Sequence, residues 1–561
     1  MKESPIFVIY LIETYLQEVL AWCSQWWYEQ LLTKWQDEEL YQWQHQLDFS
    51  PLEQACAAYH QGRVGQRGRP IEHSVSKLVR VLFLMYSQHC SYRQAESNLR
   101  RDMLWRWFAG YGLFAPVPDH NSIYLFDQYV RQHHPRLYLD TVLRQIDAQM
   151  PSVRQEKQCG DTFAVHANAA LEGPSQRLRH LVSRLLAAVD KAAPAAYEAV
   201  IAQFEEGELF GWQEQTNPYR LSAEERQARR QQTVLATLAC REAVRPLETL
   251  IPLAAQWAAY IDKVISDEFQ LQADETGRII GATLLPEKER GTHRICSATD
   301  PEASIRNHGP DKQDFGFNVS LAITSSGLIR EIQADTGSQA DVVAIPDLLR
   351  CQQAAHDLLP EKLLYDQIAG NGKTAALVAE VSGGQTQLVA KPMPYEERSQ
   401  KFGPQDCQLS EDGLCLTCPH GRTSRNRYAH PSGGHTFRFG KGQCVGCPLL
   451  QDCRGRKKQP TTPRNFYIGP YYAHYQTLVA YALTAEFRED MKQRPRVELT
   501  IAHLVGHHGV RRARVRGISK VDYRLKMTAT IYNVRWWHRR QARLARENAQ
   551  QTALPRPHCA C

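Results

Sequence analysis

Apolar and polar positions along residues 494–509 follow the period of an α-helix. Glu498 lies at the edge of the face that could be buried, which is formed by Val497, Ile501 and Leu504. Gly506 and Gly509 are predicted to end this helix, and residues 510–517 then carry a run of arginines. A carboxylate would thus be held on a rigid element beside cations that suit phosphate. The alternative is that Glu498 is an ordinary solvated helix residue.

Two further acids fall within or directly after strand-like patterns. Residues 158–168 form a short strand-like run that Asp161 interrupts, and Asp is unfavourable within a strand unless it has a function. A surface turn after Gly160 is the alternative interpretation. The apolar stretch 362–365 leads into Asp366, and active sites built on sheets commonly lie where strands end.

The rest of the central region mixes strand and helix patterns. Residues 314–333 alternate as a β-hairpin with a turn at 325–327, and a helix is expected near 340–358. Residues 174–262 are strongly helical and charged, with a capping box that begins at Ser222, and are interpreted as an inserted helical arm. This mixture predicts an α+β fold.

Residues 60–130 predict several short helices in succession. Gly68-Arg69-Pro70 forms a turn before an apolar periodic stretch, Ser91 is a plausible N-cap, and residues 118–122 cap a further helix. This is the layout of a helix-turn-helix unit, although any small helical bundle would have similar spacing.

The first 60 residues favour a packed or dimer-forming helical leader. The apolar run from Pro5 to Ile12 is closed by Glu13, so neither a secretory signal nor a membrane span is expected. Tryptophans recur along the leader, and an interfacial membrane helix is the alternative explanation for them: Trp22, Trp26, Trp27, Trp35 and Trp43.

Length and charge add a polyanion partner to this picture. A chain of 561 residues with 43% hydrophobic residues should form three or more domains with real cores. Residues 492–547 hold 15 Lys or Arg and 3 Asp or Glu, a local net charge of +12 against +7 for the whole chain. A basic segment on a near-neutral body indicates a polyanion docked at one place, with a solvated helix face as the alternative.

Six of the 15 cysteines cluster between Cys407 and Cys453. Two C-x2-C pairs with this separation are typical of tetrahedral zinc, so we expect one structural zinc on Cys415, Cys418, Cys444 and Cys447. The alternative is a set of unligated thiols. The scattered remaining cysteines favour a reduced, cytoplasmic protein.

Taken together, residues 60–540 resemble the DDE transposases of bacterial insertion sequences. The first catalytic acid of that family lies in an Asp-x-Thr strand like Asp161-Thr162, and the second follows an apolar strand, as Asp366 does. The third lies on a helix in an Arg-x3-Glu pattern like Arg494 and Glu498. Further motifs match: Ala167-Asn168-Ala169, His508-Gly509 with the basic run to Arg516, Asn533, Gly68-Arg69-Pro70, Ser91-x-Arg93, Pro118-Asp119-x-x-Ser122 and Cys418-Pro419-x-Gly421.

Two positions depart from the family pattern. Val505 stands where the family usually has a Lys seven residues after the helix Glu, so that cation is missing or is supplied by His507 or Arg511. Pro495 disfavours helical geometry at Arg494 and weakens its pairing with Glu498.

The resemblance implies a ribonuclease-H-like catalytic core in an α+β chain with insertions. It divides the chain into a helical leader (1–60), a helical, helix-turn-helix-like DNA-binding domain (61–150), a first segment of the catalytic core (151–173), a mainly helical insertion (174–289), a second core segment (290–400), a small Cys-rich, zinc-ribbon-like insertion (401–462), a third core segment with the Glu helix (463–510) and a basic C-terminal segment (511–561).

The implied activity is DNA strand cleavage at element ends followed by strand transfer into target DNA. Asp161, Asp366 and Glu498 would hold Mg²⁺ or Mn²⁺, because all-oxygen ligands suit these ions. The predicted DNA contacts are Arg93, Arg494, His507, Arg511, Arg512, Arg514, Arg516 and Lys520. The partners would be transposon-end and target DNA and a second copy of the chain, in the bacterial cytoplasm at the nucleoid. The alternatives are a non-catalytic, zinc-stabilised DNA-binding protein and a metal-dependent nuclease without strand transfer.

Overall fold

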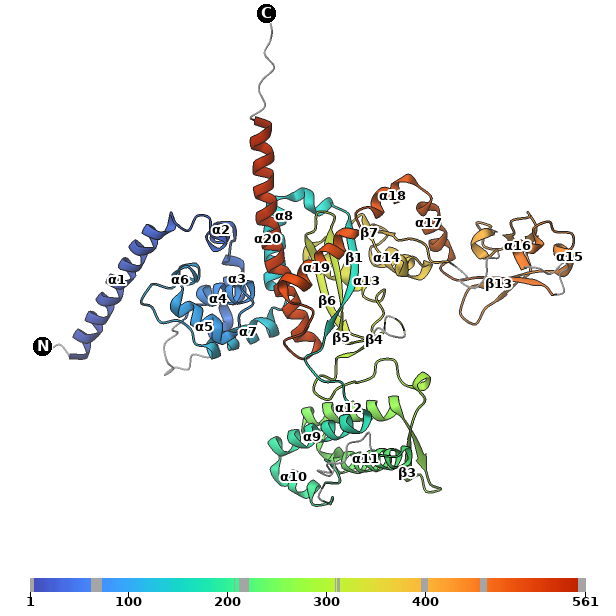
Figure 1. Cartoon of the computed structure of the whole chain (residues 1–561), viewed down its shortest axis with the longest axis horizontal. Helices are drawn as coiled ribbons and strands as arrows, with labels where there is room; N and C mark the ends of the chain where they lie inside the picture. Colours follow the sequence, from blue (N-terminus) through green and yellow to red (C-terminus); the bar gives the residue numbers. More distant parts are fainter. Residues whose placement is uncertain are drawn as a thin grey trace, which may run out of the picture.

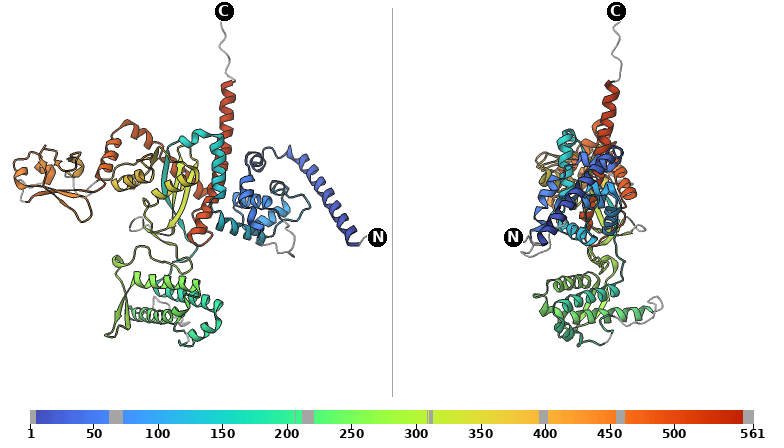
Figure 2. Two further views of the ribbon diagram at one scale, coloured as in Figure 1. Left: turned by 180° about the vertical axis from the view of Figure 1, so that it is seen from behind. Right: turned by 90° about the vertical axis from the view of Figure 1, so that its left-hand side faces the viewer.

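The computed structural model describes residues 5–61, 73–205, 207–210, 221–307, 309, 313–394, 402–454 and 462–552. Figure 1 shows a central sheet with its helices, a group of N-terminal helices beside it, a helical insertion below it and a small β-rich unit at the far end. The two views of Figure 2 show that the long C-terminal helix extends beyond this body. Among the described residues, no helix has the length and apolar content that crossing a membrane requires.

The central sheet is mixed and has the order β4-β5-β1-β7-β8, with β6 also paired to β5. The strand β5 runs antiparallel to β1, β4 and β6, whereas β7 is parallel to both β1 and β8. The predicted hairpin is therefore confirmed as β5 and β6. The strands are β1 (Gln158–His166), β4 (Ser304–Asn307), β5 (Gln313–Thr324), β6 (Ile329–Thr336), β7 (Lys362–Leu364) and β8 (Gln387–Val389).

The N-terminal region is helical, and the predicted caps are confirmed. Ser91 and Gln94 form a capping box on α5, and Asp119 caps α7. The Gly68-Arg69-Pro70 turn lies outside the described residues. The elements are α1 (Pro5–Leu32), α2 (Glu39–Gln46), α3 (Ser50–Ala55), η1 (Ala57–His60), α4 (Val75–Ser87), α5 (Tyr92–Arg101), α6 (Met103–Phe108), α7 (His120–His133), α8 (Leu137–Gln149) and η2 (Pro151–Gln155).

The helical insertion has a hydrophobic cluster of its own. The predicted capping box of Ser222 with Glu225 is present at the start of α11. The insertion consists of α9 (Pro174–Ala192), α10 (Pro194–Ile201), α11 (Ala223–Val244), η4 (Arg245–Leu247), α12 (Pro252–Glu268), β2 (Phe269–Ala273), β3 (Ile279–Leu284) and η5 (Glu287–Glu289).

The cysteine-rich unit is a set of short strands with a separate small core. It contains η7 (Pro404–Asp406), β9 (Gln408–Leu409), β10 (Leu416–Thr417), β11 (Thr423–Ser424), β12 (Arg427–Ala429), β13 (His435–Phe439), α15 (Lys441–Cys444), α16 (Leu450–Arg454) and β14 (Arg464–Ile468).

The remaining helices surround the sheet: α13 contacts β5 and β6, α14 contacts β8, α19 contacts β1 and α20 contacts β6. Gly509, with a φ of 62°, ends α19 as predicted. The prediction that Gly506 also ends α19 is wrong. The helix continues to His508, which is buried on the same face as Leu504. These elements are α13 (Ile345–His356), η6 (Gln367–Ala369), α14 (Gly372–Val381), α17 (Tyr472–Ala482), α18 (Ala485–Met491), α19 (Pro495–His508) and α20 (Ile518–Thr552).

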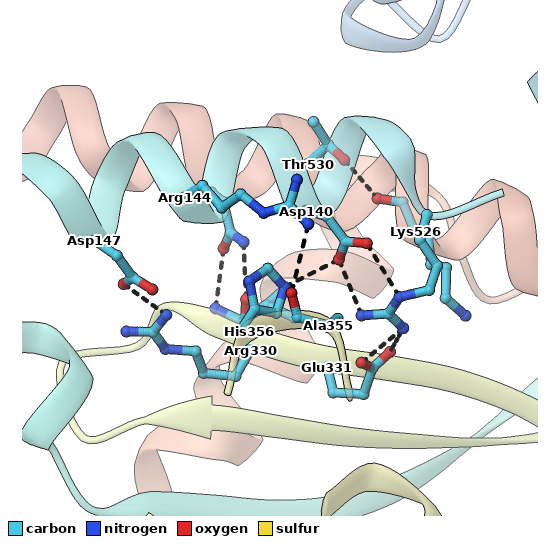
Figure 3. Close-up of polar contacts among 12 residues, drawn as sticks. Asp140, Arg144, Asp147, Arg330, Glu331, Ala355, His356, Lys526 and Thr530 are labelled. Atoms are coloured by element: carbon cyan, nitrogen blue, oxygen red, sulfur yellow. Dashed lines mark hydrogen bonds and ion pairs between the residues drawn. The ribbon is translucent and has the colours of Figure 1, made fainter. Parts of the chain in front are cut away.

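Buried ion pairs join the helices to one end of the sheet (Figure 3). Arg330 on β6 binds Asp147 on α8 at 2.7 Å, and both side chains are almost fully buried. Asp140, on the same helix α8, lies 3.0 Å from the ring of His356 at the end of α13. Because a buried charge is stable only with its partner, these contacts fix how α8 and α13 meet the sheet.

The outer edge of β6 is closed by side chains of α20. The fully buried Asn533 amide accepts the Ile329 N–H at 2.9 Å and donates to the Ile329 carbonyl at 2.8 Å. Farther along the strand, the Asp522 carboxylate accepts the Ala334 N–H at 3.1 Å. These side chains take the place of a further strand, because buried peptide groups need hydrogen-bond partners.

We expect Asn533→Leu to destabilise the protein by about 2–6 kcal/mol, since two buried backbone groups lose their partners at about 1–3 kcal/mol each. Urea denaturation measures this change. Ser519→Ala on an exposed position of the same helix is the control and should change stability by less than about 0.5 kcal/mol. Equal stabilities for the two variants would contradict this role of Asn533.

Candidate active site

Asp161 lies in the middle of the central strand β1, between β5 and β7. The side chain is 18% exposed, and its Oδ1 accepts the N–H of Thr162 at 2.8 Å. The predicted strand is thus confirmed, and no surface turn follows Gly160, because Gly160 and Asp161 both lie within β1.

Asp366 is placed beside Asp161 by the packing of the residues before each acid. Asp366 closely follows β7, which runs parallel to β1, and its Oδ1 accepts the N–H of Ile368 at 3.2 Å. The ring of Tyr365 packs on Gly160 so closely that a Cβ there would lie 2.0 Å from a ring carbon. The sequence did not indicate this role of Tyr365, a buried residue that directly precedes the predicted acid Asp366.

Glu498 is carried by α19, which packs against β1 and buries Val497 and Leu504. Arg494 joins two of the acids: its guanidinium donates to Glu498 Oε1 at 2.5 Å and to Asp161 Oδ2 at 3.1 Å. The expectation that Pro495 disfavours helical geometry at Arg494 is wrong, since Arg494 has a φ of −55° and a ψ of −40°. Pro495 is the first residue of the helix, where its fixed φ is compatible with helical geometry.

The charges of the other two acids and of Arg494 act on the carboxyl of Asp161. Burial raises the pKa of Asp161, the Thr162 N–H and Arg494 oppose this rise, and the charges of Asp366 and Glu498 add to it. No three His, Cys, Asp or Glu side chains of the described residues are arranged as a metal site. The cation between Asp161 and Glu498 is that of Arg494.

The predicted basic run lies along the end of β1. The His166 N–H donates to the Arg511 carbonyl at 2.8 Å, and the Ala513 N–H donates to the His166 carbonyl at 2.9 Å. The guanidiniums of Arg511, Arg514 and Arg516 also donate to the backbone carbonyls of Ala164, His89 and Asn168. The other predicted DNA contacts are exposed, namely Arg93, His507, Arg512 and Lys520.

A second basic surface beside α19 was not singled out by sequence reasoning. A groove of about 290 Å³ runs between α19 and α20 and is lined by Arg496, Arg539, Arg540 and Arg543 together with His503 and Trp536. The available signal was the spacing of these arginines along α20. This spacing did not stand out as an exposed basic face, because the preceding stretch of the same helix, from Val521 to Trp537, is mostly buried in the core.

Four cysteines of the cluster line one small apolar cavity: Cys418, Cys444, Cys447 and Cys453. The predicted ligand Cys415 does not line it. Its backbone N–H and carbonyl bind Ser410 in the turn between β9 and β10.

Two segments of the chain match known protein families. Residues 28–129 match the family described as Transposase domain (DUF772), and residues 417–538 match the Transposase DDE domain. Together the two matches support an insertion-sequence DDE transposase. No curated protein and no solved structure matches it.

The two matched segments cover different regions of the transposase. The first covers the helices from the end of α1 to most of α7, and the second runs from the cysteine-rich unit into α20. Arg494 and Glu498 lie inside the second segment, whereas Asp161 and Asp366 lie between the two.

We expect Gly160→Ala to destabilise the transposase by about 1–3 kcal/mol, because the new methyl group and the Tyr365 ring cannot occupy the same space. Chemical denaturation measures this loss, and Tyr365→Leu in the same chain should recover some of it. Gly173→Ala is the matched control, since a Cβ at Gly173 meets no atom within 4 Å. A similar loss in both single variants would show that the Tyr365 contact is not responsible.

Proposed function

We propose that this transposase cleaves DNA at the ends of an insertion sequence and joins the freed 3′ ends to target DNA. The observation that carries the proposal is the arrangement of Asp161, Asp366 and Glu498. They come from a strand, a strand end and a helix, and the charges of the last two raise the pKa of Asp161. Carboxylates from separate elements are an economical way to hold the metal ions that assist phosphodiester cleavage.

We further propose that the central sheet with its helices is a ribonuclease-H-like core. Support comes from the first acid on the central strand β1, the second after the adjacent parallel strand β7 and the third on α19, which packs on β1. Residues far apart in the sequence are thereby held on neighbouring rigid elements, as a catalytic site requires.

The donor atoms of these three acids suit a hard divalent cation, Mg²⁺ or Mn²⁺, because all of them are oxygen. Asp161, Asp366 and Glu498 would hold it, and it would stabilise charge on the attacking and leaving oxygens. Arg494 neutralises some of the charge of Asp161 and Glu498, so its guanidinium competes with a cation for these oxygens.

Basic and aromatic surfaces near the site support DNA as the substrate. Arg511 to Arg516 and the groove beside α19 carry guanidiniums, and phosphates bind such surfaces without regard to sequence. The helices of residues 61–150, with Arg93 exposed on α5, would then read the element ends.

A homodimer on DNA belongs to the same proposal. Trp22, Trp26 and Trp27 on α1 are 67%, 48% and 43% exposed, and such large apolar side chains on one helix favour burial against a second copy.

We expect Asp161→Asn, Asp366→Asn and Glu498→Gln each to reduce cleavage of element-end DNA by more than about 10³-fold while leaving folding and DNA binding largely intact. The three acids act as a unit, so the triple variant should be scarcely worse than any single one. Gel analysis of a labelled end substrate in Mg²⁺ or Mn²⁺ measures cleavage.

Glu489→Gln, at an exposed acid on α18 that pairs with Lys492, is the matched control and should cleave at the wild-type rate. Wild-type cleavage by any of the three site variants would refute the catalytic assignment. Binding without cleavage by the wild-type chain itself would instead favour the non-catalytic DNA-binding protein.

We also propose a structural zinc in the cysteine-rich unit. Thiolates are the ligands that structural zinc prefers, and the shared cavity favours Cys418, Cys444, Cys447 and Cys453 over a set containing Cys415. The zinc would stabilise a unit of short strands whose own core is small.

Elemental analysis of the purified chain should find about one zinc per chain. Cys447→Ser should lose it and, like a strong chelator, lower the thermal midpoint of this unit. Cys415→Ser is the control that should retain the metal. Loss of zinc in the Cys415 variant would restore the ligand set expected from the sequence, and absence of zinc from the wild-type chain would leave unligated thiols.

A further inference from the structure

A cavity of about 300 Å³ lies where the turn between α4 and α5 meets the basic segment after α19 and the first turns of α20. Three arginines line it, Arg512, Arg514 and Arg524, and none of its described lining residues is an aspartate or glutamate. None of the three arginines forms an ion pair with another described residue. Cations without counter-charges around a partly enclosed space attract an anion.

Two histidines on the same wall have unused hydrogen-bonding capacity. His508 is only 5% exposed, and neither of its ring nitrogens has a partner among the described residues. The ring of His89 lies 5.2 Å away, and its buried Nε2 also lacks a described partner. Leaving a buried polar group without a partner costs about 1–3 kcal/mol, so these nitrogens indicate an absent hydrogen-bonding group.

His508 is uncharged and can donate a hydrogen bond to an acceptor group of a ligand in the cavity. Burial, followed by the neighbouring His89 and Arg535, lowers the pKa of His508 to about 3. The ring is therefore neutral at neutral pH and still has one N–H to donate. The positive charge around the cavity comes from the arginines alone.

The cavity is larger than a bare anion requires. Its volume is at the lower end of the range for small-ligand sites. Its wall also includes apolar side chains and two tyrosines, and Arg524 stacks on the ring of Tyr86 with 5.9 Å between guanidinium carbon and ring centroid. The sugar and base of a nucleotide could pack on the apolar and tyrosine side chains, whereas its phosphate could bind the arginines.

We propose that this cavity binds one phosphate-bearing nucleotide of the DNA strand, with its phosphate between Arg512, Arg514 and Arg524 and with His508 and His89 completing its hydrogen bonds. This rests on the proposed function, because the ligand is a nucleotide of the DNA substrate. Val165 of β1 lines the same cavity, so the nucleotide would contact both α5 and the strand that carries Asp161. DNA bound by the N-terminal helices is thereby positioned against the catalytic strand.

The first test measures binding of a labelled DNA duplex of arbitrary sequence to the full chain that carries Asp161→Asn, so that the DNA stays intact. Arg524→Gln should weaken binding about tenfold and reduce the slope of log affinity against log salt by about 1. Arg245→Gln, an exposed position in the helical insertion and outside the cavity, should keep both near their starting values. If Arg524→Gln unfolds, Arg512→Gln in the exposed segment serves the same purpose.

The second test separates the phosphate from the base by thermal unfolding with deoxyadenosine monophosphate or deoxyadenosine. The monophosphate should raise the thermal midpoint, deoxyadenosine should not, and Arg524→Gln should abolish the shift. Stabilisation by the monophosphate with unchanged DNA affinity in the Arg524 variant would assign the cavity to free nucleotides and overturn the proposal.

Wild-type affinity and salt slope in the Arg524 and Arg512 variants, with no shift from the monophosphate, would also overturn it. Cleavage by the chain with Asp161 intact is measured separately. Loss of the proposed function therefore appears as binding without cleavage, and loss of the cavity assignment appears as unchanged binding in the variants.

Discussion

The open edge of β6 is the constraint on which the rest of the core depends. The backbone N–H and C=O groups along a buried strand edge need hydrogen-bond partners. On β6, the side chains of Asn533 and Asp522 from α20 are these partners. This attachment fixes α20 against the sheet and so fixes the segment between α19 and α20 along the end of β1. Because that segment is continuous with α19, the position of Glu498 depends on contacts that α20 makes with a distant strand.

The second constraint on the core is the repulsion of the Asp161 carboxylate by the charges of Asp366 and Glu498. Three carboxylates are brought near one another on β1, after β7 and on α19, and burial disfavours the charged form of the central one. Arg494 compensates by binding Asp161 and Glu498 together. Contacts within the chain thus hold Asp161 and Glu498 in place, and under the proposed function a divalent cation would take over the role of the Arg494 charge.

The separate cores explain how insertions are accommodated. The N-terminal helices share one continuous hydrophobic cluster with the sheet and α20, whereas the helical insertion and the cysteine-rich unit each have their own. The insertions therefore fold around local contacts and leave the strand pairing of the core unchanged. The N-terminal helices, in contrast, are tied rigidly to the strand that carries Asp161.

The sequence by itself determined the local elements and the candidate acids. The strand around Asp161, the strand end at Asp366, the hairpin and the caps at Ser91, Asp119 and Ser222 follow from periodicity and capping chemistry, which act over a few residues. Gly506 was misjudged because burial of His508 extends α19. Tertiary structure alone decided that Tyr365 packs on Gly160, that Arg494 joins two acids and that Cys453, and not Cys415, lines the cysteine cavity. These contacts join residues brought together by folding, and no local pattern records which side chains will meet across a sheet.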